Sequence, residues 1–435
     1  MRNIVSILML TLGVAISALA QNTATSGAVH QEQLAAKFRD TRAAAEGGSV
    51  SNQIALASMY ENGQGVARDD AQAVAWYRKA AEQGSAIAQD RLGFMYEHGR
   101  GVQQDDAQAF AWRRKAADNG LTIAQAGLGA MYASGRGVAR DDAQAVAWYR
   151  KVIEQGNTDG LAYAQVGLGA MYESGRGVAR DDARAFELFR QAAEQGLADA
   201  QNNLGVMYAN GRGVARDDAQ AAAWYRKAAE QGLAAAQFAL GSLYGMGHGV
   251  ERDETQAAVW LGKAAEQGHA HAQYLLGAMY ANGQGVAQDN AQAVGWLRKA
   301  AEQGRADAQT HLGFMYETGR GVARDDAQAV RWYRKAAEQG YANAQFNLGV
   351  RYERGQGVTH DDAQATAWYR QAAEQGFADA QNSLGVMYAE GRGVRRDDAQ
   401  AVAWFRKAAD QGVADAKNNL NAMYKNGRGA PQKAP

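Results

Sequence analysis

The sequence contains no cysteine and only two prolines among its 435 residues. Without cysteine the chain has no disulfide framework, no thiolate nucleophile and no redox role, so its stability must come from packing. Both prolines, Pro431 and Pro435, stand at the end of the chain, which suits a nearly all-helical body. An excess of one charge is also missing, since 46 basic and 46 acidic residues cancel. This balance argues against binding to nucleic acid or anionic membranes through bulk charge.

Only one long apolar run occurs, at residues 4–16, and it is too short for a membrane span. Arg2 precedes it and Ala18-Leu19-Ala20 follows, which is the pattern of a secretory signal peptide with a small-residue cleavage site. We therefore predict a signal peptide at residues 1–20, cleavage after Ala20, and a periplasmic or secreted protein with no membrane span after cleavage. Residues 21–30 are polar and small, and we expect a flexible lead-in there.

The dominant feature that is present is an internal repeat. Its G-x-G pairs recur every 36 residues, except for one step of 40 residues between Gly135 and Gly175. A fixed period in this range is the signature of stacked repeat arrays. The first glycines of the pairs are Gly63, Gly99, Gly135, Gly175, Gly211, Gly247, Gly283, Gly319, Gly355, Gly391 and Gly427.

Each unit is predicted to form two helices and two turns. The first helix carries A-Q-x-x-L-G-x-M-Y, as in residues 88–96, with apolar residues at a helical period. The glycine inside this pattern, Gly93 for example, indicates a closely approaching neighbouring backbone. The G-x-G pair then ends the helix. The second helix opens on D-D-A-Q, which predicts aspartate N-caps.

Comparing the units with one another identifies a candidate core. The leucine and the tyrosine of the first helix are present in all eleven units, and the N-cap aspartate is present in all ten second helices. We interpret the tryptophans as core, because a single helix pair cannot bury its apolar face and must stack; an aromatic cage or cofactor site is the alternative. All nine occupy one repeat position: Trp76, Trp112, Trp148, Trp224, Trp260, Trp296, Trp332, Trp368 and Trp404.

Together these residues resemble the Sel-one-like repeat (SLR), a relative of the tetratricopeptide repeat, with the pattern A-x-x-x-L-G-x-x-Y-x-x-G-x-G-V-x-x-D-x-x-x-A-x-x-W-Y-x-K-A-A-x-x-G. Residues 211–232 show its second half almost unbroken. The resemblance implies an all-α fold, a right-handed α/α superhelix (solenoid) of about ten 36-residue helix-turn-helix repeats with capping helices. It also implies proteins that mostly act as adaptors or scaffolds. Some secreted members carry a disulfide in each repeat, which this chain cannot form.

The repeat phase predicts the organisation of the whole chain. After the lead-in we place an N-terminal capping helix at 31–48, the SLR repeat array at 49–412, a C-terminal capping half-repeat at 413–429 and a disordered tail at 430–435. Asp40 takes the tryptophan position in the first cap, as expected where one flank faces water. The insertion at residues 157–160 is predicted to be a surface loop, either a tolerated extension or a contact for a partner.

No catalytic pattern is present. The sequence lacks Ser-x-x-Lys, G-x-S-x-G and the P-loop, so a β-lactam hydrolase remains only a remote alternative. His269 and His271 form an H-x-H pair, but residues two apart diverge on a helix and no carboxylate pattern supports a metal site. We therefore assign no catalytic residue, no metal and no cofactor, and we predict that the protein is not an enzyme.

Partner binding is expected where the repeats vary, six and two residues before the repeat tyrosine. These positions share one helical face, and in related solenoids the first helices line the concave surface. Packing between repeats is the alternative for the aromatics. Arg351, with Arg354 nearby, is predicted to meet a partner carboxylate or else to be a solvated substitution. The candidate partner-binding residues are Phe94, Phe238, Tyr274, Phe314, Phe346 and Arg351.

The predicted function is a non-enzymatic protein- or peptide-binding scaffold or adaptor, in the bacterial cell envelope or secreted, which uses the concave face of the solenoid. The sequence does not identify the partner, and it indicates no nucleic acid. The alternative is an envelope scaffold associated with peptidoglycan or another cell-wall glycan, for which aromatic platforms would also serve.

Overall fold

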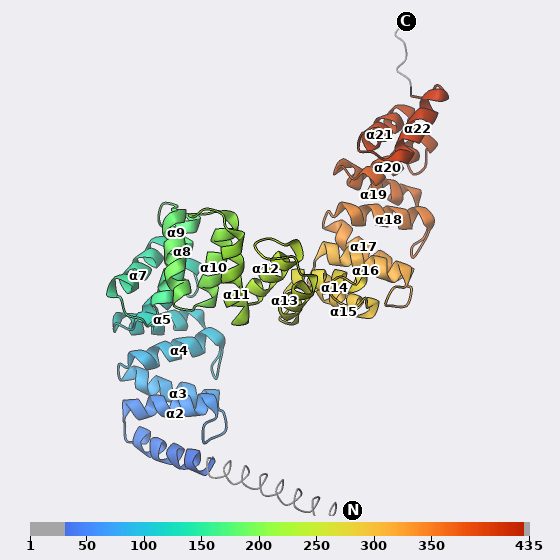
Figure 1. Cartoon of the computed structure of the whole chain (residues 1–435). Helices are drawn as coiled ribbons and strands as arrows, with labels where there is room; N and C mark the ends of the chain where they lie inside the picture. Colours follow the sequence, from blue (N-terminus) through green and yellow to red (C-terminus); the bar gives the residue numbers. More distant parts are fainter. Residues whose placement is uncertain (1–30, 430–435) are drawn as a thin grey trace, which may run out of the picture. The chain divides into compact units, whose positions relative to one another are not determined.

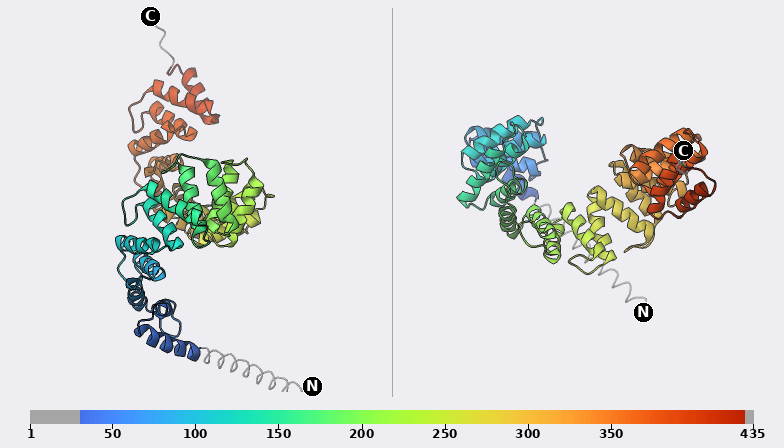
Figure 2. Two further views of the ribbon diagram at one scale, coloured as in Figure 1. Left: turned by 90° about the vertical axis from the view of Figure 1, so that its left-hand side faces the viewer. Right: turned by 90° about the horizontal axis from the view of Figure 1, so that it is seen from above.

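The structure is a computed structural model that describes residues 31–429, and this part of the chain is helical with no strand (Figure 1). The predicted signal peptide, lead-in and C-terminal tail lie outside the described residues. The chain divides into two compact units, Met1–Arg216 and Asp217–Pro435. Within each unit, successive helices pack side by side in chain order, as the two further views confirm (Figure 2).

The first unit contains a helix at residues 31–46 and then the helices of four repeats and part of a fifth. They are α2 (Val50–Asn62), α3 (Asp70–Glu82), α4 (Ala86–His98), α5 (Asp106–Asp118), α6 (Thr122–Ser134), α7 (Asp142–Gln155), α8 (Leu161–Ser174), α9 (Asp182–Glu194) and α10 (Ala198–Asn210). Even-numbered helices are the first helices of their repeats and odd-numbered helices are the second.

The second unit continues the same alternation and ends on an unpaired first helix. Its helices are α11 (Asp218–Glu230), α12 (Ala234–Met246), α13 (Glu254–Glu266), α14 (Ala270–Asn282), α15 (Asn290–Glu302), α16 (Ala306–Thr318), α17 (Asp326–Glu338), α18 (Ala342–Arg354), α19 (Asp362–Glu374), α20 (Ala378–Glu390), α21 (Asp398–Asp410) and α22 (Ala414–Lys425). The paired, all-helical repeat fold is thus confirmed, while the exact domain boundaries stay predictions.

Local sequence signals determine where these helices begin and end. Asp105 is the N-cap of α5, and its carboxylate accepts a hydrogen bond from the backbone N–H of Gln108 at 2.9 Å. The equivalent aspartate caps each of the ten second helices, which confirms the prediction. Gly99 ends α4 in the left-handed conformation with φ +64°, and Gly101 follows with φ +65°.

The glycine that follows the repeat leucine in the first helices α4 to α20 faces the core. A Cβ on Gly129 would lie 2.7 Å from the ring of Tyr149, and one on Gly169 would lie 2.8 Å from the ring of Phe189. The close neighbour predicted from the sequence is therefore present, but in these repeats it is an aromatic ring of the paired helix rather than a backbone. A larger residue would force the two helices of the pair apart.

The tryptophan row is only partly core. Trp76 and Trp260 are buried, whereas the other seven are half-buried, and the following residue of the repeat fills the interior instead, as Tyr333 does at 0% exposure. A lysine three residues further on covers the outer face of most of these rings, as Lys227 covers Trp224 at 3.7 Å from the ring centroid. The core interpretation is thus confirmed for the inner face of most of these rings, because side chains such as Trp112, Trp332 and Trp404 pack against the buried clusters, while their outer face lies outside the core.

Candidate functional site

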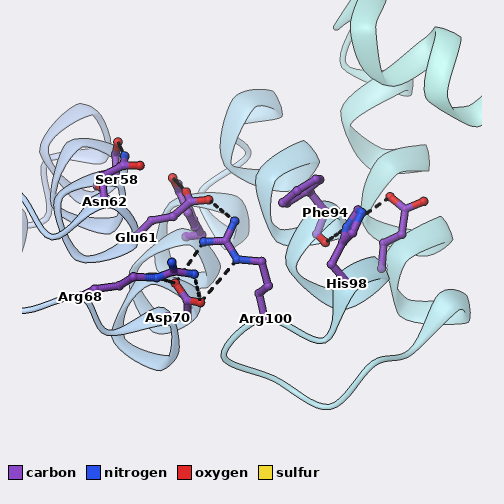
Figure 3. Close-up of polar contacts among 10 residues, drawn as sticks. Ser58, Glu61, Asn62, Arg68, Asp70, Phe94, His98 and Arg100 are labelled. Atoms are coloured by element: carbon purple, nitrogen blue, oxygen red, sulfur yellow. Dashed lines mark hydrogen bonds and ion pairs between the residues drawn. The ribbon is translucent and has the colours of Figure 1, made fainter. Parts of the chain in front are cut away.

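An ion-pair network spaces the repeats and so positions the first helices. Arg100, in the turn after α4, bonds Glu61 of the preceding repeat at 3.0 Å and Asp70 at 3.1 Å (Figure 3). Hydrogen bonds from Arg68 and Arg100 lower the pKa of the Asp70 carboxyl to about 2. The second aspartate of D-D therefore links consecutive repeats here, and Asp106, Asp142, Asp362 and Asp398 make the equivalent ion pair. The sequence reasoning missed this role when it assigned both aspartates to capping.

A glutamine row sets the spacing at the opposite end of the first helices. Gln89 is buried, and its amide donates to the carbonyl of Ala81 at 3.1 Å. Asn119 of the same repeat's second helix donates to the Gln89 side-chain oxygen at 2.9 Å. With both ends held by such bonds, the first helices present a regular surface on which single substitutions can shape a site.

One groove, which we call groove 1, runs over the first helices of the N-terminal unit. It has a volume of about 650 Å³ and lies on α4, α6 and α8, with α5 and α7 beneath. It is lined by Ile87, Asp90, Arg91, Phe94, Arg113, Leu121, Ile123, Ala126, Gly127, Ala130, Tyr149, Tyr163 and Val166.

Three large apolar side chains project at one repeat position in groove 1, nine residues before the repeat tyrosine. They are Ile87, Ile123 and Tyr163, at 53%, 43% and 57% exposure, and we call them the apolar rim. The sequence reasoning missed this position. The signal was available, because the other repeats carry Ser, Asp, Ala, His or Asn there.

The floor of groove 1 contains a carboxylate with incomplete bonding. Asp90 is largely buried, and burial raises its pKa above the ordinary range despite the nearby guanidinium groups. The Nε of Arg113 lies 3.7 Å from the Asp90 carboxylate, whereas Arg113 bonds Glu97 at 2.6 Å. Arg113 thus lies near two carboxylates, but its close ion pair is with Glu97 and not with Asp90.

The insertion at residues 157–160 shapes groove 1 rather than only extending a loop. Gly160 packs so closely on α6 that a Cβ there would lie 2.9 Å from the Cα of Ile123. As a result α6 and α8 contact each other more extensively than other successive first helices within either unit. Gly167 makes room for this approach, since a Cβ there would lie 2.3 Å from the Tyr149 ring.

A second groove, groove 2, lies on α12, α13 and α14 of the C-terminal unit, with a volume of about 600 Å³ and a mostly apolar lining. Phe238 stands at its wall, stacked on His269 with ring centroids 4.5 Å apart and against His271 at 4.9 Å. Burial lowers the pKa of both histidines. Its other lining residues include Met246, Leu275, Ala278 and Met279.

The predicted aromatic residues are distributed over both units. Phe94 lines groove 1, and Phe238 lines groove 2. Tyr274 is half-buried beside His311, whereas Phe314 is 39% exposed. Phe346 packs against Tyr369 and Phe377 at 5.7 and 5.3 Å between ring centroids, which matches the packing alternative. The five aromatics thus differ in their surroundings: two line grooves, one is half-buried, one is exposed and one packs between helices.

Arg351 corrects an expectation. It is 5% exposed, and its guanidinium bonds the carboxylate of Glu317 at 2.9 Å. The expectation of a solvated side chain is therefore wrong, and the carboxylate that Arg351 meets belongs to the same chain rather than to a partner. Arg351 stands where other repeats carry methionine or leucine, so a buried position forces its charge to find a partner within the fold.

The H-x-H pair is used for packing. His269 is the N-cap of α14, and its Nδ1 accepts the backbone N–H of Ala272 at 3.2 Å. Within residues 31–429, no three His, Asp or Glu side chains gather in an arrangement that could hold a metal ion. In the same part of the chain, no helix has both the length and the apolar character to cross a membrane.

Comparison with known proteins agrees with this architecture. A family profile described as Sel1 repeat matches ten segments: 53–85, 86–121, 122–157, 162–197, 198–233, 234–269, 270–304, 306–341, 342–377 and 378–413. No curated protein matches the sequence.

Two crystal structures are similar over most of the chain. One is a protective antigen present in uropathogenic Escherichia coli strains that displays an SLR fold; it is 39% identical, with 89% of this chain and 90% of that chain covered and a TM-score of 0.54. The other is a Sel1 repeat protein from Oxalobacter formigenes, which is 37% identical, with 76% and 93% covered and a TM-score of 0.54.

Proposed function

Because this chain belongs to the Sel1 repeat family, we propose that it is a scaffold that binds a protein or peptide partner along the exposed face of its first helices. One observation carries the proposal. Both grooves are formed at the same positions of the first helices, nine, six, five and two residues before the repeat tyrosine. The residues at these positions differ from repeat to repeat, whereas the leucines that hold the pairs together are buried.

The chemistry of the grooves suits protein side chains. Ile123 and Tyr163 in groove 1 and Met246 in groove 2 are large apolar groups that the fold leaves exposed. Exposed apolar surface of this kind marks interaction sites, and a few buried anchors carry most of the energy of a protein interface. A rigid frame also lowers the entropic cost of binding, because the groove need not be ordered by its partner.

Site-specific photo-crosslinking in the producing cells tests this function. The crosslinker p-benzoylphenylalanine replaces Ile123 in groove 1 or Met246 in groove 2. The matched controls replace Val259 on α13, which is 46% exposed, or Ala111 on α5. We expect adducts of discrete mass from the groove positions only. Adducts from the control positions alone, or none from any position, would contradict a first-helix binding face.

We also infer that the protein is exported, because residues 1–20 have the three parts of a signal peptide. The mature chain would begin at Gln21 and meet its partner in the periplasm or outside the cell. N-terminal sequencing of the protein from fractionated cells tests this inference. A cytoplasmic protein that retains Met1 would contradict it.

A further inference from the structure

Groove 1 contains three charged residues at repeat positions where the other repeats carry no residue of that kind. Asp90 is the only acid six residues before a repeat tyrosine, and Arg91 is the only arginine five residues before one. Arg113 is the only charged residue at a position that is Tyr, Phe or Leu in the other second helices. All three line groove 1 together with the apolar rim. The substitutions therefore converge on one place although they lie on two helices.

The two carboxylates near Arg113 differ in how many partners they have. Arg113 bonds Glu97, and Glu97 also bonds Arg136 at 2.8 Å, so the Glu97 carboxylate is well satisfied. Asp90 keeps only the 3.7 Å approach of Arg113 and accepts no hydrogen bond from any residue that the structure describes. The Asp90 side chain is 21% exposed, so water still reaches its carboxylate. A ligand that covers this carboxylate displaces that water and must supply a hydrogen-bond donor, because a buried carboxylate without one is costly.

Asp90, which lacks a hydrogen-bond donor, lies next to the apolar rim. Residues 87, 90 and 94 lie three and four apart on α4 and so share one helical face, with Asp90 between Ile87 and Phe94. Ile123 and Tyr163 present the same rim position on the next two first helices. A ligand that covers the rim would therefore seal the Asp90 carboxylate from water, which strengthens any ion pair made there.

The dimensions and the remaining charge restrict the ligand further. First helices of neighbouring repeats packed at ordinary distances place three helices across about 20 Å, the length of roughly six residues of extended peptide. Arg91 is exposed beside Asp90, so it would repel a segment with several positive charges. A ligand with one cation between apolar side chains fits both the Asp90 carboxylate and the apolar rim.

We propose that groove 1 recognises a short peptide segment in which a single lysine or arginine stands between large apolar residues. The cation pairs with the carboxylate of Asp90, and the apolar residues pack on the apolar rim. This inference rests on the proposed peptide-binding function and specifies the ligand class of one of its two grooves.

Selection from a random peptide library tests the proposal. The mature chain, residues 21–435, is the bait for an mRNA-displayed library of octapeptides. Enriched peptides are then measured by fluorescence anisotropy, each beside analogues in which the basic residue is replaced by norleucine or glutamate. We expect enriched peptides with one basic residue between apolar ones, and at least about tenfold weaker binding of both analogues.

Variants locate the contact. Asp90→Asn removes the charge with little change of shape, and we expect it to abolish the preference for the basic peptide over its norleucine analogue. Tyr163→Ala, on the apolar rim, should weaken all three peptides alike. The matched controls are Asp410→Asn, an exposed acid at the end of the second helix α21, and Tyr341→Ala, an exposed tyrosine at the start of α18; both should bind as the unchanged protein does. Circular dichroism confirms that each variant is folded.

The outcomes separate the two proposals. Enrichment of acidic or uncharged peptides, or equal binding by Asp90→Asn and the unchanged protein, overturns the inference about groove 1. If such peptides still lose affinity with Tyr163→Ala or Phe238→Ala, the first-helix binding function stands. If the library yields no peptide that depends on either groove, both proposals fail.

Discussion

Gly101 lies so close to Asp70 that a Cβ atom at residue 101 would be 2.1 Å from the Asp70 carbonyl oxygen. The turn after α4 thus rests directly on the N-terminus of α3 in the preceding repeat. The same turn places Arg100 on the Asp70 carboxylate, so one three-residue G-R-G segment makes both a backbone and an ionic contact between repeats. Gly137 repeats this relationship with Asp106 at 1.9 Å.

Gly101→Ala should destabilise the local repeats far more than Gly84→Ala. Both residues have positive φ, so alanine at either position costs about 1 kcal/mol of backbone strain. Only at Gly101 must the added methyl group also displace a neighbouring backbone. We expect Gly101→Ala to cost at least about 2 kcal/mol more than Gly84→Ala. Hydrogen exchange of α3 and α4 amides measures this, because repeat arrays need not unfold in one step. Equal loss of protection in the two variants would contradict the contact.

The link between Arg100 and Asp70 predicts an acid-sensitive interface. The folded pKa of Asp70 is about 2, below the ordinary value of 3.8. Between these values the unfolded chain binds a proton that the folded chain does not, so this contribution to stability is complete above about pH 4 and is lost as the pH falls through about 2. NMR titration of the Asp70 carboxyl should give a midpoint near 2, and Arg100→Gln should raise it. A midpoint that Arg100→Gln leaves unchanged would show that Arg68 alone sets the pKa.

The buried tyrosines should differ in what their hydroxyl groups contribute. The Tyr333 hydroxyl donates to Glu317 at 2.7 Å, whereas the Tyr149 hydroxyl has no hydrogen-bond partner among residues 31–429. Tyr333→Phe should therefore cost about 1.5 to 3 kcal/mol, the range for a hydrogen bond to a charged group, and Tyr149→Phe should stay within about 0.5 kcal/mol. Urea denaturation followed by circular dichroism compares the two variants. A larger loss for Tyr149→Phe would refute the assignment.

Arg351 offers a test of what a buried ion pair contributes. Its position holds methionine or leucine in the other repeats, so Arg351→Met restores the common core residue and leaves Glu317 bonded to Tyr333. We expect Arg351→Met to be neutral or stabilising, whereas Glu317→Ala should cost about 3 kcal/mol because it leaves the guanidinium buried and unpaired. The free energies of unfolding of the two single variants and the double variant measure the coupling. Additive effects would mean that the two side chains do not interact.

The sequence predicted helix pairs and caps well, because those signals act within a few residues. Asp105 and Gln108 lie three apart, and the aspartate caps the helix wherever it occurs. Adjacent residues were harder to assign. Tryptophan and tyrosine follow each other in the second helix, about 100° apart around its axis, and the sequence does not say which one faces the neighbouring repeat.

The positions that line the two grooves were predicted only in part. Two of these positions emerged from variation between repeats, and they include Phe94 and Phe238 in the two grooves. Two further positions, nine residues before the repeat tyrosine at the apolar rim and five residues before it, were visible in the same comparison and were overlooked. Phe346 shows the limit of the method, because its packing against Tyr369 and Phe377 depends on side chains of later helices.

By itself, the sequence determined the repeat, the order of the helices and the residues at which they begin and end. Each of these depends on residues a few positions apart and on a period that the printed chain displays. Only the tertiary structure decided that Arg351 is buried on Glu317, that Arg100 joins Asp70, and that three first helices leave an apolar rim around a carboxylate without a donor. Those relationships join residues about one repeat apart, and stacking alone brings such residues into contact.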